Sequence, residues 1–307
     1  MVLARSRRTL VVLLVGLSLL GLSGGRFGGS AVLAQGATFD CPAPATPAAA
    51  ASSSSAVASP VAMEASFPEE GGDLTVFAAA SLTDAFEQIE TDLEAAHPGL
   101  TITYNFGGSQ ALVTQLAEGA EADVFASANN TQMKAATDNG SISGEPVTFV
   151  HNRLVIVTPA DNPADIESPA DLGTEGLKLV LAQVEVPVGR YAREAVCLMS
   201  RDAASYGEDF VARVAGNVVS EEEDVRDVLA KVALGEADAG IVYVSDAASA
   251  GDEVRLIEIP DAVNIVASYP IAAVTGGDAA LAEGFIAYLL SAEGQATLTE
   301  FGFEPVG

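Results

Sequence analysis

The chain has no tryptophan, only two cysteines and two histidines, and few basic residues for its 307-residue length. Lysine and arginine together number 14 against 42 aspartates and glutamates, so the formal net charge is −28 at pH 7. This shortage of positive charge excludes binding of nucleic-acid phosphates through a basic patch. It also means that long-range attraction cannot steer an anion to the protein. Any anionic ligand must therefore be held by uncharged donors at short range.

The two histidines, His97 and His151, lie far apart and lack the spacing of metal ligands. The chain also has no nucleophile elbow, no P-loop and no cysteine–histidine pair with a plausible spacing. We therefore expect neither a protein-bound metal ion nor a cofactor, and we expect a protein that is not an enzyme.

The N-terminus has the features of an export signal. Arg5, Arg7 and Arg8 precede an unbroken apolar stretch from Leu10 to Leu22, and small residues follow near Ala34. This apolar stretch is short for a membrane span, so cleavage is favoured over permanent anchoring. We predict a signal peptide over 1–34 and a location in the periplasm or at the outer face of the cytoplasmic membrane.

Residues 35–72 are rich in alanine, serine and proline, a composition typical of a disordered linker. No lipobox precedes Cys41, which argues against a lipid anchor. The second cysteine, Cys197, lies in a predicted helix. In an exported chain such an even pair can form a disulfide that attaches the linker to the folded part. The alternative is a free Cys41 and a small, buried Cys197.

After the linker, apolar strand patterns alternate with helical ones. This alternation predicts an α/β fold with mixed, mostly parallel sheets flanked by helices. The length suits two lobes, which we place at 73–152 plus 255–307 and at 153–254. Strands are predicted near 74–79, 101–106, 123–127, 148–158, 178–183, 238–243, 254–259 and 265–274. Helices are predicted near 82–96, 110–119, 130–138, 188–200, 222–235, 278–291 and 292–301.

Two of the strand–helix junctions carry a serine. The stretch LTVFAAASLTDAF places Ser81 after an apolar strand, at the start of a helical pattern. The strand LTITYNF is followed by Gly107, Gly108 and Ser109, and another helical pattern begins there. Unpaired amides at helix starts favour anions, so two such serines can converge on one anion. The alternative is that each serine is an ordinary helix cap.

Five segments in order resemble one family. They are FAAASLTDAF, FGGSQALVTQLAEGAEADVFASA, VPVGRYAREA, EEDVRDVL and AGIVYVSDA. Together they resemble the periplasmic molybdate-binding proteins of ABC importers, and the resemblance spans about 73–306. It implies a two-lobed type II periplasmic binding-protein fold that holds a tetrahedral oxyanion, molybdate and also tungstate, between its lobes. It also implies a monomer that delivers the anion to the membrane permease of an importer.

Carried over by motif, the implied ligand residues are Ser81 and Ser109 from one lobe and Val188, Val225 and Tyr243 from the other. They would hold the anion through its oxygens, with no direct bond from protein to metal. Val188 and Val225 fall at predicted helix starts, where their amides are free to donate. Tyr243 ends an apolar strand. Core packing is the alternative for the two valines, and a buried structural role is the alternative for the tyrosine.

Two arginines, Arg190 and Arg226, neighbour these positions, and for each we favour a surface or interlobe salt bridge. The sequence Gly107-Gly108-Ser109-Gln110 lacks the run of serines that is common in the resembling family, which leaves the preferred oxyanion open. Sulfate has the same charge and tetrahedral shape and is the main competing ligand. An enzyme or the ligand-sensing domain of a regulator would be a different class of protein, and no sequence feature favours either.

Overall fold

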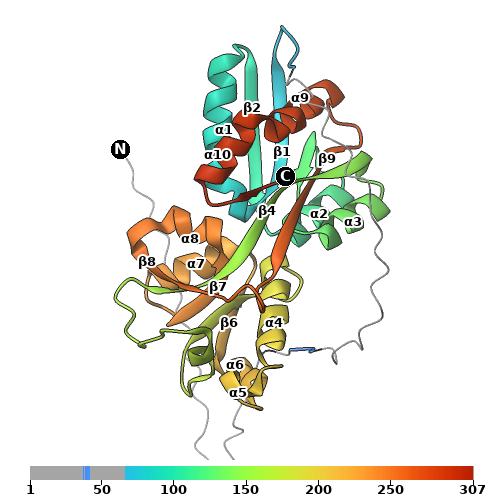
Figure 1. Ribbon diagram of the computed structural model, residues 1–307. Helices are drawn as coiled ribbons and strands as arrows, with labels where there is room; N and C mark the ends of the chain where they lie inside the picture. The colour runs from blue at the N-terminus through green and yellow to red at the C-terminus, as the bar shows by residue number, and fades with distance from the viewer. Residues whose placement is uncertain (1–36, 38, 42–65, 307) are drawn as a thin grey trace, which may run out of the picture. The chain divides into compact units, whose positions relative to one another are not determined.

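The computed structural model describes residues 37, 39–41 and 66–306 (Figure 1). The predicted signal peptide, its cleavage site and the larger part of the predicted linker lie outside these residues. In the part of the chain that the structure describes, no helix is both long and apolar enough to cross a membrane.

Sheet A is built from strands near both ends of the described chain. The strand β1 (Gly72–Ala79) pairs in parallel with β2 (Leu100–Gly107) on one side and with β3 (Val124–Ala126) on the other. The strand β9 (Val266–Val274) is antiparallel to β3 and to the first part of β4 (Ile142–Pro159). A short β10 (Glu304–Pro305) pairs with β4 as well.

Sheet B continues from the second part of β4. Antiparallel to that part lie β7 (Ala239–Tyr243) and β8 (Val254–Glu258). The strand β5 (Leu179–Ala182) is parallel to β7 and to β6 (Val218–Glu222). Because β4 pairs with β9 up to Arg153 and with β7 from Leu154, this single strand belongs to both sheets.

The expectation of mostly parallel sheets holds for β1 to β3 and for β5 to β7, whereas the pairings of β4 and β9 are antiparallel. The sheets are therefore mixed. The proposed lobe boundaries at 152/153 and 254/255 stay a prediction. The strand β8 pairs within sheet B, although the predicted boundary places most of its segment in the first lobe.

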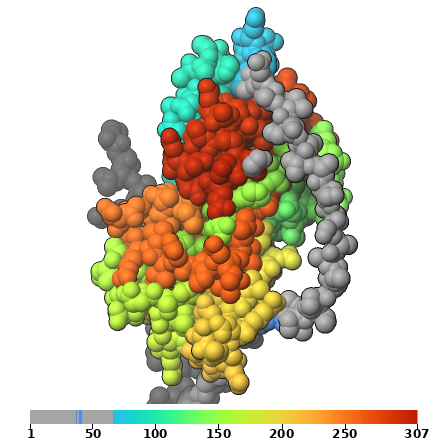
Figure 2. All heavy atoms as spheres, viewed as in Figure 1, coloured from blue at the N-terminus to red at the C-terminus, as the bar shows by residue number. Residues whose placement is uncertain are grey.

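Helices cover both sheets. Beside sheet A lie α1 (Thr83–Ala96), preceded by the 3-10 turn η1 (Ala80–Leu82), and α2 (Ser109–Ala117), α3 (Asn130–Asp138), α9 (Ala279–Leu290) and α10 (Ala292–Glu300). Helix α9 packs on β1 and β9. In the view of Figures 1 and 2, the red helices α9 and α10 lie in front of sheet A and hide much of it.

Beside sheet B lie α4 (Pro187–Met199), α5 (Ala203–Tyr206), α6 (Phe210–Asn217), α7 (Val225–Ala233) and α8 (Val244–Ala250), with 3-10 turns η2 (Pro169–Gly173) and η3 (Gly251–Glu253). Helices α4 and α7 contact both β5 and β7. Helix α7 illustrates why the elements form: Val225, Val228, Leu229 and Val232 repeat at helical spacing and are all buried.

Candidate functional site

The five residues singled out from the sequence line one narrow cavity. Its volume is about 10 Å³, close to what a single water molecule requires. Elements that flank sheet A and elements that flank sheet B both contribute to it. The lining residues are Ala79, Ala80, Ser81, Gly107, Gly108, Ser109, Ala128, Val186, Pro187, Val188, Asp224, Val225 and Tyr243.

Ser81 enters the cavity from the turn that joins β1 to α1. The residue is 3% exposed and lies in η1, directly before the helix. Its Oγ lies 2.9 Å from the hydroxyl oxygen of Tyr269. The small side chains of Ala79 and Ala80 keep the backbone close to the cavity. Ser81 therefore brings both a hydroxyl and a helix-start amide to the site.

Ser109 is the first residue of α2 and is 1% exposed. Its Oγ accepts a hydrogen bond from the Ala128 amide at 3.1 Å, so the hydroxyl hydrogen remains free to donate. The preceding Gly108 is required by close packing: an added Cβ would lie 2.6 Å from the carbonyl oxygen of Glu223. The glycine thus lets the two sides of the cavity approach each other.

Val188 lies in the first turn of α4, after Pro187 at the start of that helix. First-turn amides have no partner within their own helix, so the Val188 amide is available to a ligand. The tight corner needs Gly189, because a Cβ there would meet the carbonyl oxygens of Ala182 and Gln183 at 2.4 and 2.1 Å. The side chain of Val188 itself is buried in the core.

Val225 is the first residue of α7. The N-cap residue, Asp224, uses its Oδ1 to accept from the Arg226 amide at 2.8 Å and from the Asp227 amide at 3.1 Å. These two bonds leave the Val225 amide, which lies at the cavity, as a further helix-start donor. The valine side chain packs in the core, as the alternative interpretation of the sequence expected.

Tyr243 ends β7 and is 1% exposed. Its hydroxyl makes no aligned hydrogen bond with a described residue, although the phenol of Tyr269 lies close enough to help raise its pKa. Burial raises the pKa of this phenol well above its usual value, so the group stays protonated and can donate. A buried donor without a partner is unfavourable in a ligand-free protein, which makes it a strong candidate for a ligand contact.

Among the residues that the structure describes, the lining contains no lysine or arginine, and its one charged member, Asp224, is the helix cap. The positive ends of four helical segments, η1, α2, α4 and α7, border the cavity instead. Such ends favour negative charge through their unpaired amides and their dipoles. The arrangement suits a small anion that accepts hydrogen bonds.

Contacts around the cavity join the two sets of elements. The side-chain amide of Gln110 donates to the Glu223 carbonyl at 2.9 Å, and that of Gln132 donates to the Glu185 carbonyl at 3.0 Å. Arg226 on α7 forms an ion pair with Asp84 on α1. The predicted salt bridge of Arg226 is therefore present, between elements of sheets A and B.

Arg226 also contacts a buried carboxylate. Its Nε lies 3.1 Å from Oδ1 of Asp246, although the two groups are not aligned as a hydrogen bond. Asp246 is completely buried, and its other oxygen accepts from the Tyr243 amide at 3.2 Å. Burial raises the pKa of Asp246 to about 7, against the opposing effect of Arg226.

Sequence reasoning missed a polar cluster behind Ser81. Asn152 on β4, Ser245 on α8 and Tyr269 on β9 are all buried. The Nδ2 of Asn152 donates to Ser245 Oγ at 2.9 Å and lies 3.5 Å from the Tyr269 hydroxyl. These three residues lie far apart in the sequence, so no local pattern predicts that they meet. The one available signal was the polar Tyr269 within the apolar strand SYPIAAV.

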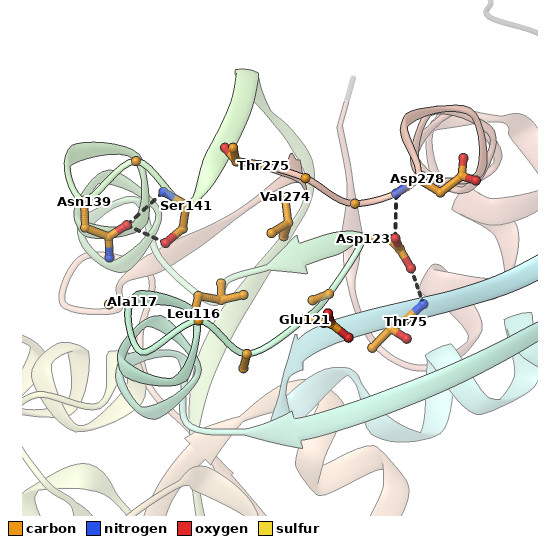
Figure 3. A pocket seen from close by; sticks show the side chains of 16 residues that line it. Thr75, Leu116, Ala117, Glu121, Asp123, Asn139, Ser141, Val274, Thr275 and Asp278 are labelled. Atoms are coloured by element: carbon orange, nitrogen blue, oxygen red, sulfur yellow. Dashed lines mark hydrogen bonds between the residues drawn. The ribbon is translucent and has the colours of Figure 1, made fainter.

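A larger hollow lies elsewhere, beside the starts of β1 and β3. It has a volume of about 650 Å³ and includes none of the five predicted residues (Figure 3). One of its carboxylates, Asp123, accepts from the amides of Thr75 and Asp278, each at 2.7 Å. Because those bonds occupy the carboxylate, we place the candidate site in the narrow cavity despite its smaller size.

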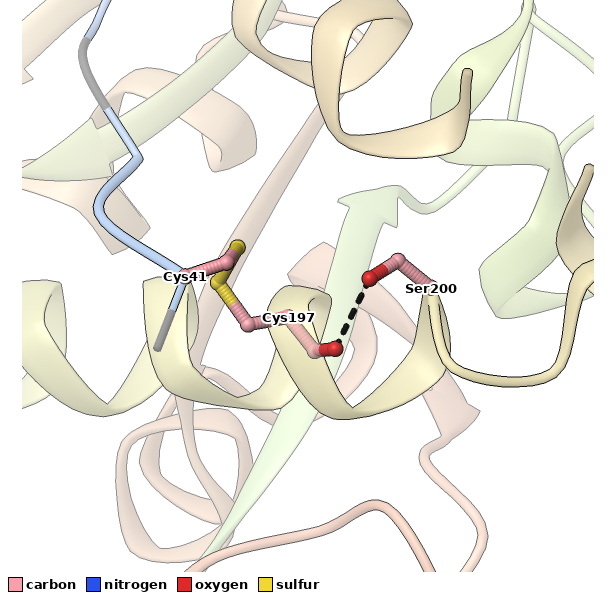
Figure 4. Close-up of a disulfide and its surroundings, with 3 residues drawn as sticks. All are labelled: Cys41, Cys197 and Ser200. Atoms are coloured by element: carbon pink, nitrogen blue, oxygen red, sulfur yellow. Dashed lines mark hydrogen bonds between the residues drawn. A yellow bond between two sulfur atoms is a disulfide. The ribbon is translucent and has the colours of Figure 1, made fainter. Parts of the chain in front are cut away.

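The disulfide question that the sequence left open has an answer. Cys41 and Cys197 form a disulfide on α4, the helix whose start carries Val188 (Figure 4). Nearby, the ring of Phe39 lies 5.5 Å from the guanidinium of Arg193. At the other described end of the predicted linker, Phe67 packs against His97 with ring centres 4.7 Å apart. Both described ends of that segment are therefore attached to the folded part.

Comparisons with known proteins show what the chain as a whole is similar to. Residues 74–304 match the family model described as bacterial extracellular solute-binding protein. The chain is 42% identical to the molybdate-binding protein of Mycobacterium tuberculosis over 238 residues, which cover 77% of this chain and 86% of that protein.

Among solved structures, the substrate-binding domain of a putative molybdenum ABC transporter from Clostridium difficile matches with a TM-score of 0.57 and 29% identity, over 76% of this chain and 99% of that one. The sulfate-binding protein SubI from Mycobacterium tuberculosis matches with a TM-score of 0.67 and 17% identity, over 76% and 87% of the two chains. At this identity, the second likeness shows a shared fold alone.

Proposed function

The chain belongs to the bacterial extracellular solute-binding protein family, and on that premise we propose that it binds molybdate, and also tungstate, outside the cytoplasm. We propose further that it works in the periplasm or at the outer face of the membrane and passes the anion to the permease of an ABC importer. Ser81, Ser109, Val188, Val225 and Tyr243 would hold the oxyanion.

One observation carries this proposal. Neutral donors from both sheets converge on a single buried cavity, and one of them is the unpartnered hydroxyl of Tyr243. A tetrahedral dianion presents only acceptors, which matches a lining that offers N–H and O–H groups. A cationic ligand such as a polyamine would require carboxylates, and the single one present already caps α7.

The strength of such a site is adequate without formal positive charge. Four amides and three hydroxyls give about seven donors, each worth about 1.5–3 kcal/mol toward a charged acceptor. The middle of their summed range, roughly 10–20 kcal/mol, lies above the middle of the association cost of about 4–15 kcal/mol. Low micromolar to nanomolar affinity is therefore within reach, provided that the cavity excludes water.

Binding requires the two sides to separate and close again. The cavity has room for about one water molecule, and an anion with four oxygens is larger. The Arg226–Asp84 ion pair and the Gln110–Glu223 bond lie between the two sides and would break and re-form in each cycle. Hinge closure around a ligand is a common motion of two-lobed binding proteins.

Sulfate is the second candidate, because it shares the charge and shape of molybdate and because the fold is also that of a sulfate-binding protein. The test is calorimetric titration of the purified protein with molybdate, tungstate, sulfate and phosphate. We expect submicromolar binding of molybdate and tungstate and at least tenfold weaker binding of sulfate. Tight sulfate binding with weak molybdate binding would overturn the ligand assignment.

A further inference from the structure

We propose that Tyr269 and Asn152 are positioning residues that turn the hydroxyl hydrogen of Ser81 into the cavity, so that the site rejects anions that carry a proton. The proposal rests on the function given above and deepens it. It assigns a role in ligand selection to two residues that do not line the cavity.

The order of donors and acceptors is set first by Asn152, which is completely buried. Its Oδ1 accepts a hydrogen bond from the Arg153 amide at 2.9 Å, which fixes the orientation of the side-chain amide. The Nδ2 group can therefore only face inward, where it donates to Ser245 Oγ and points at the Tyr269 hydroxyl oxygen from 3.5 Å. Tyr269 thus meets a donor on this side.

The Tyr269 hydroxyl accepts from Asn152 and has its own hydrogen left to donate. Of the two groups that hydrogen-bond to its hydroxyl, the Asn152 amide nitrogen can only donate, whereas Ser81 Oγ, 2.9 Å away, can accept. The phenol is completely buried, so leaving its hydrogen without an acceptor would be unfavourable. Burial also raises the pKa of Tyr269 well above its usual value, which keeps the hydrogen in place. Tyr269 therefore donates to Ser81.

Ser81 then accepts from Tyr269, and its single hydroxyl hydrogen is left to donate to the ligand. Ser109 is fixed in the same sense, because its Oγ accepts from the Ala128 amide. Both serine hydroxyls consequently act as donors. Molybdate accepts from both, whereas hydrogen phosphate brings an O–H group that needs an acceptor. The carboxylate among the described lining residues, Asp224, is engaged as the cap of α7, whose Arg226 and Asp227 amides both donate to its Oδ1.

The test measures discrimination between molybdate and phosphate at pH 7, where phosphate carries at least one proton. In Tyr269→Phe the Ser81 oxygen loses its donor and becomes free to accept. We expect the preference for molybdate over phosphate to narrow by roughly tenfold. In a Ser81→Ala background, the same change should have no further effect on either anion. Tyr104→Phe is the control, because that half-buried hydroxyl donates to the Phe86 carbonyl and does not line the cavity.

Two results from the variants would overturn the proposal: an unchanged preference in folded Tyr269→Phe, or effects of Ser81→Ala and Tyr269→Phe that simply multiply. If Tyr269→Phe does not fold, Asn152→Ala leaves the phenol in place and should narrow the same preference. If the wild type binds sulfate and not molybdate, the ligand assignment fails while the same variants, titrated with sulfate and phosphate, still test the relay. Equally tight binding of phosphate and molybdate by the wild type would also overturn the proposal, because it would show that protonated anions are not rejected.

Discussion

The side-chain amide of Gln110 donates a 2.9 Å hydrogen bond to the backbone carbonyl of Glu223. Gln110 follows Ser109 at the start of α2, and Glu223 precedes Asp224, the cap of α7. One bond therefore joins a helix start beside sheet A to a helix start beside sheet B. The same carbonyl would lie 2.6 Å from a Cβ on Gly108.

This packing predicts the effect of Gly108→Ala. The added methyl group must push the two helix starts apart, so closure around the ligand is impaired. We expect molybdate binding to weaken by about 1–3 kcal/mol, measured by calorimetry. Gly216→Ala is the matched control, because nothing lies within 4 Å of a Cβ at that helical position. Equal affinity of the two variants would contradict the close approach inferred at Gly108.

Removal of either serine hydroxyl should weaken binding. We expect Ser81→Ala and Ser109→Ala each to weaken binding by about 1–3 kcal/mol, since each deletes a donor to a buried charge. Ser127→Ala removes a buried hydroxyl that bonds to the Asn129 carbonyl, and it should leave affinity unchanged. A serine whose loss has no effect is not a ligand residue.

Tyr243 and Tyr104 should respond oppositely to the loss of a hydroxyl. In Tyr243→Phe the missing group made no aligned hydrogen bond with any described residue, so the ligand-free protein should keep or gain stability while affinity falls by about 1–3 kcal/mol. In Tyr104→Phe a bond to the Phe86 carbonyl is lost, so stability should fall and affinity should not change. Thermal unfolding and titration of both variants provide the comparison. A marked loss of stability in Tyr243→Phe would mean that its hydroxyl serves the fold.

Asp246 predicts a pH dependence of stability. Its pKa is raised from 3.8 to about 7 in the folded protein by burial, so between these values the folded state binds the proton that the unfolded state has lost. The contribution is fully present below a pH of about 4, falls as pH rises to about 7 and is lost above that. The charged groups that face Asp246 are Arg226, Asp84 and Asp224.

Asp246→Asn should remove this component, on the order of a few kcal/mol, from the stability measured by urea unfolding between about pH 4 and pH 8. The asparagine oxygen can still accept from the Tyr243 amide. Asp138→Asn is a control at an exposed i,i+4 ion pair and should leave the profile nearly unchanged. Parallel pH profiles of wild type and Asp246→Asn would contradict the raised pKa.

Loss of the disulfide should affect stability and not affinity. Cys41 and Cys197 are 156 residues apart in sequence, so the bond closes a long loop in the unfolded chain. We expect Cys41→Ser to lower the free energy of unfolding by about 3–5 kcal/mol. Reduction of the wild type with a thiol should reproduce that loss. Molybdate affinity should be retained, because neither cysteine lines the cavity. A large loss of affinity would give the bridge a role in the site.

The sequence predicted the elements that have strong local signals. Helix α3 has the predicted bounds, and α1, α4 and the strands of the core differ by a few residues or less at most ends. The half-exposed β6 was missed because VVSEE lacks a continuous apolar run. Helix α8 was missed because its seven residues follow β7 without a break.

The candidate site also contains residues that have a local signal in the sequence and contacts that have none. The start of a helix leaves a mark in the sequence, which is how the pattern of residues singles out Ser81 and Ser109. Val188, Val225 and Tyr243 were implied by the resemblance to the family, and their place in the sequence alone does not separate a ligand contact from core packing. The Tyr269–Ser81 contact joins residues 188 positions apart, and no local pattern encodes it. The sequence predicts that Arg226 forms an ion pair but does not identify the partner. That partner, Asp84, depends on how the elements of the two sheets approach each other.

The most direct measurement is a crystal structure of the protein grown with molybdate, with molybdenum located by its anomalous scattering. The account predicts one peak inside the narrow cavity, with the oxyanion held by the hydroxyls of Ser81, Ser109 and Tyr243 and the amides of Val188 and Val225. A peak elsewhere on the protein, or an anion surrounded chiefly by lysine and arginine side chains, would contradict it.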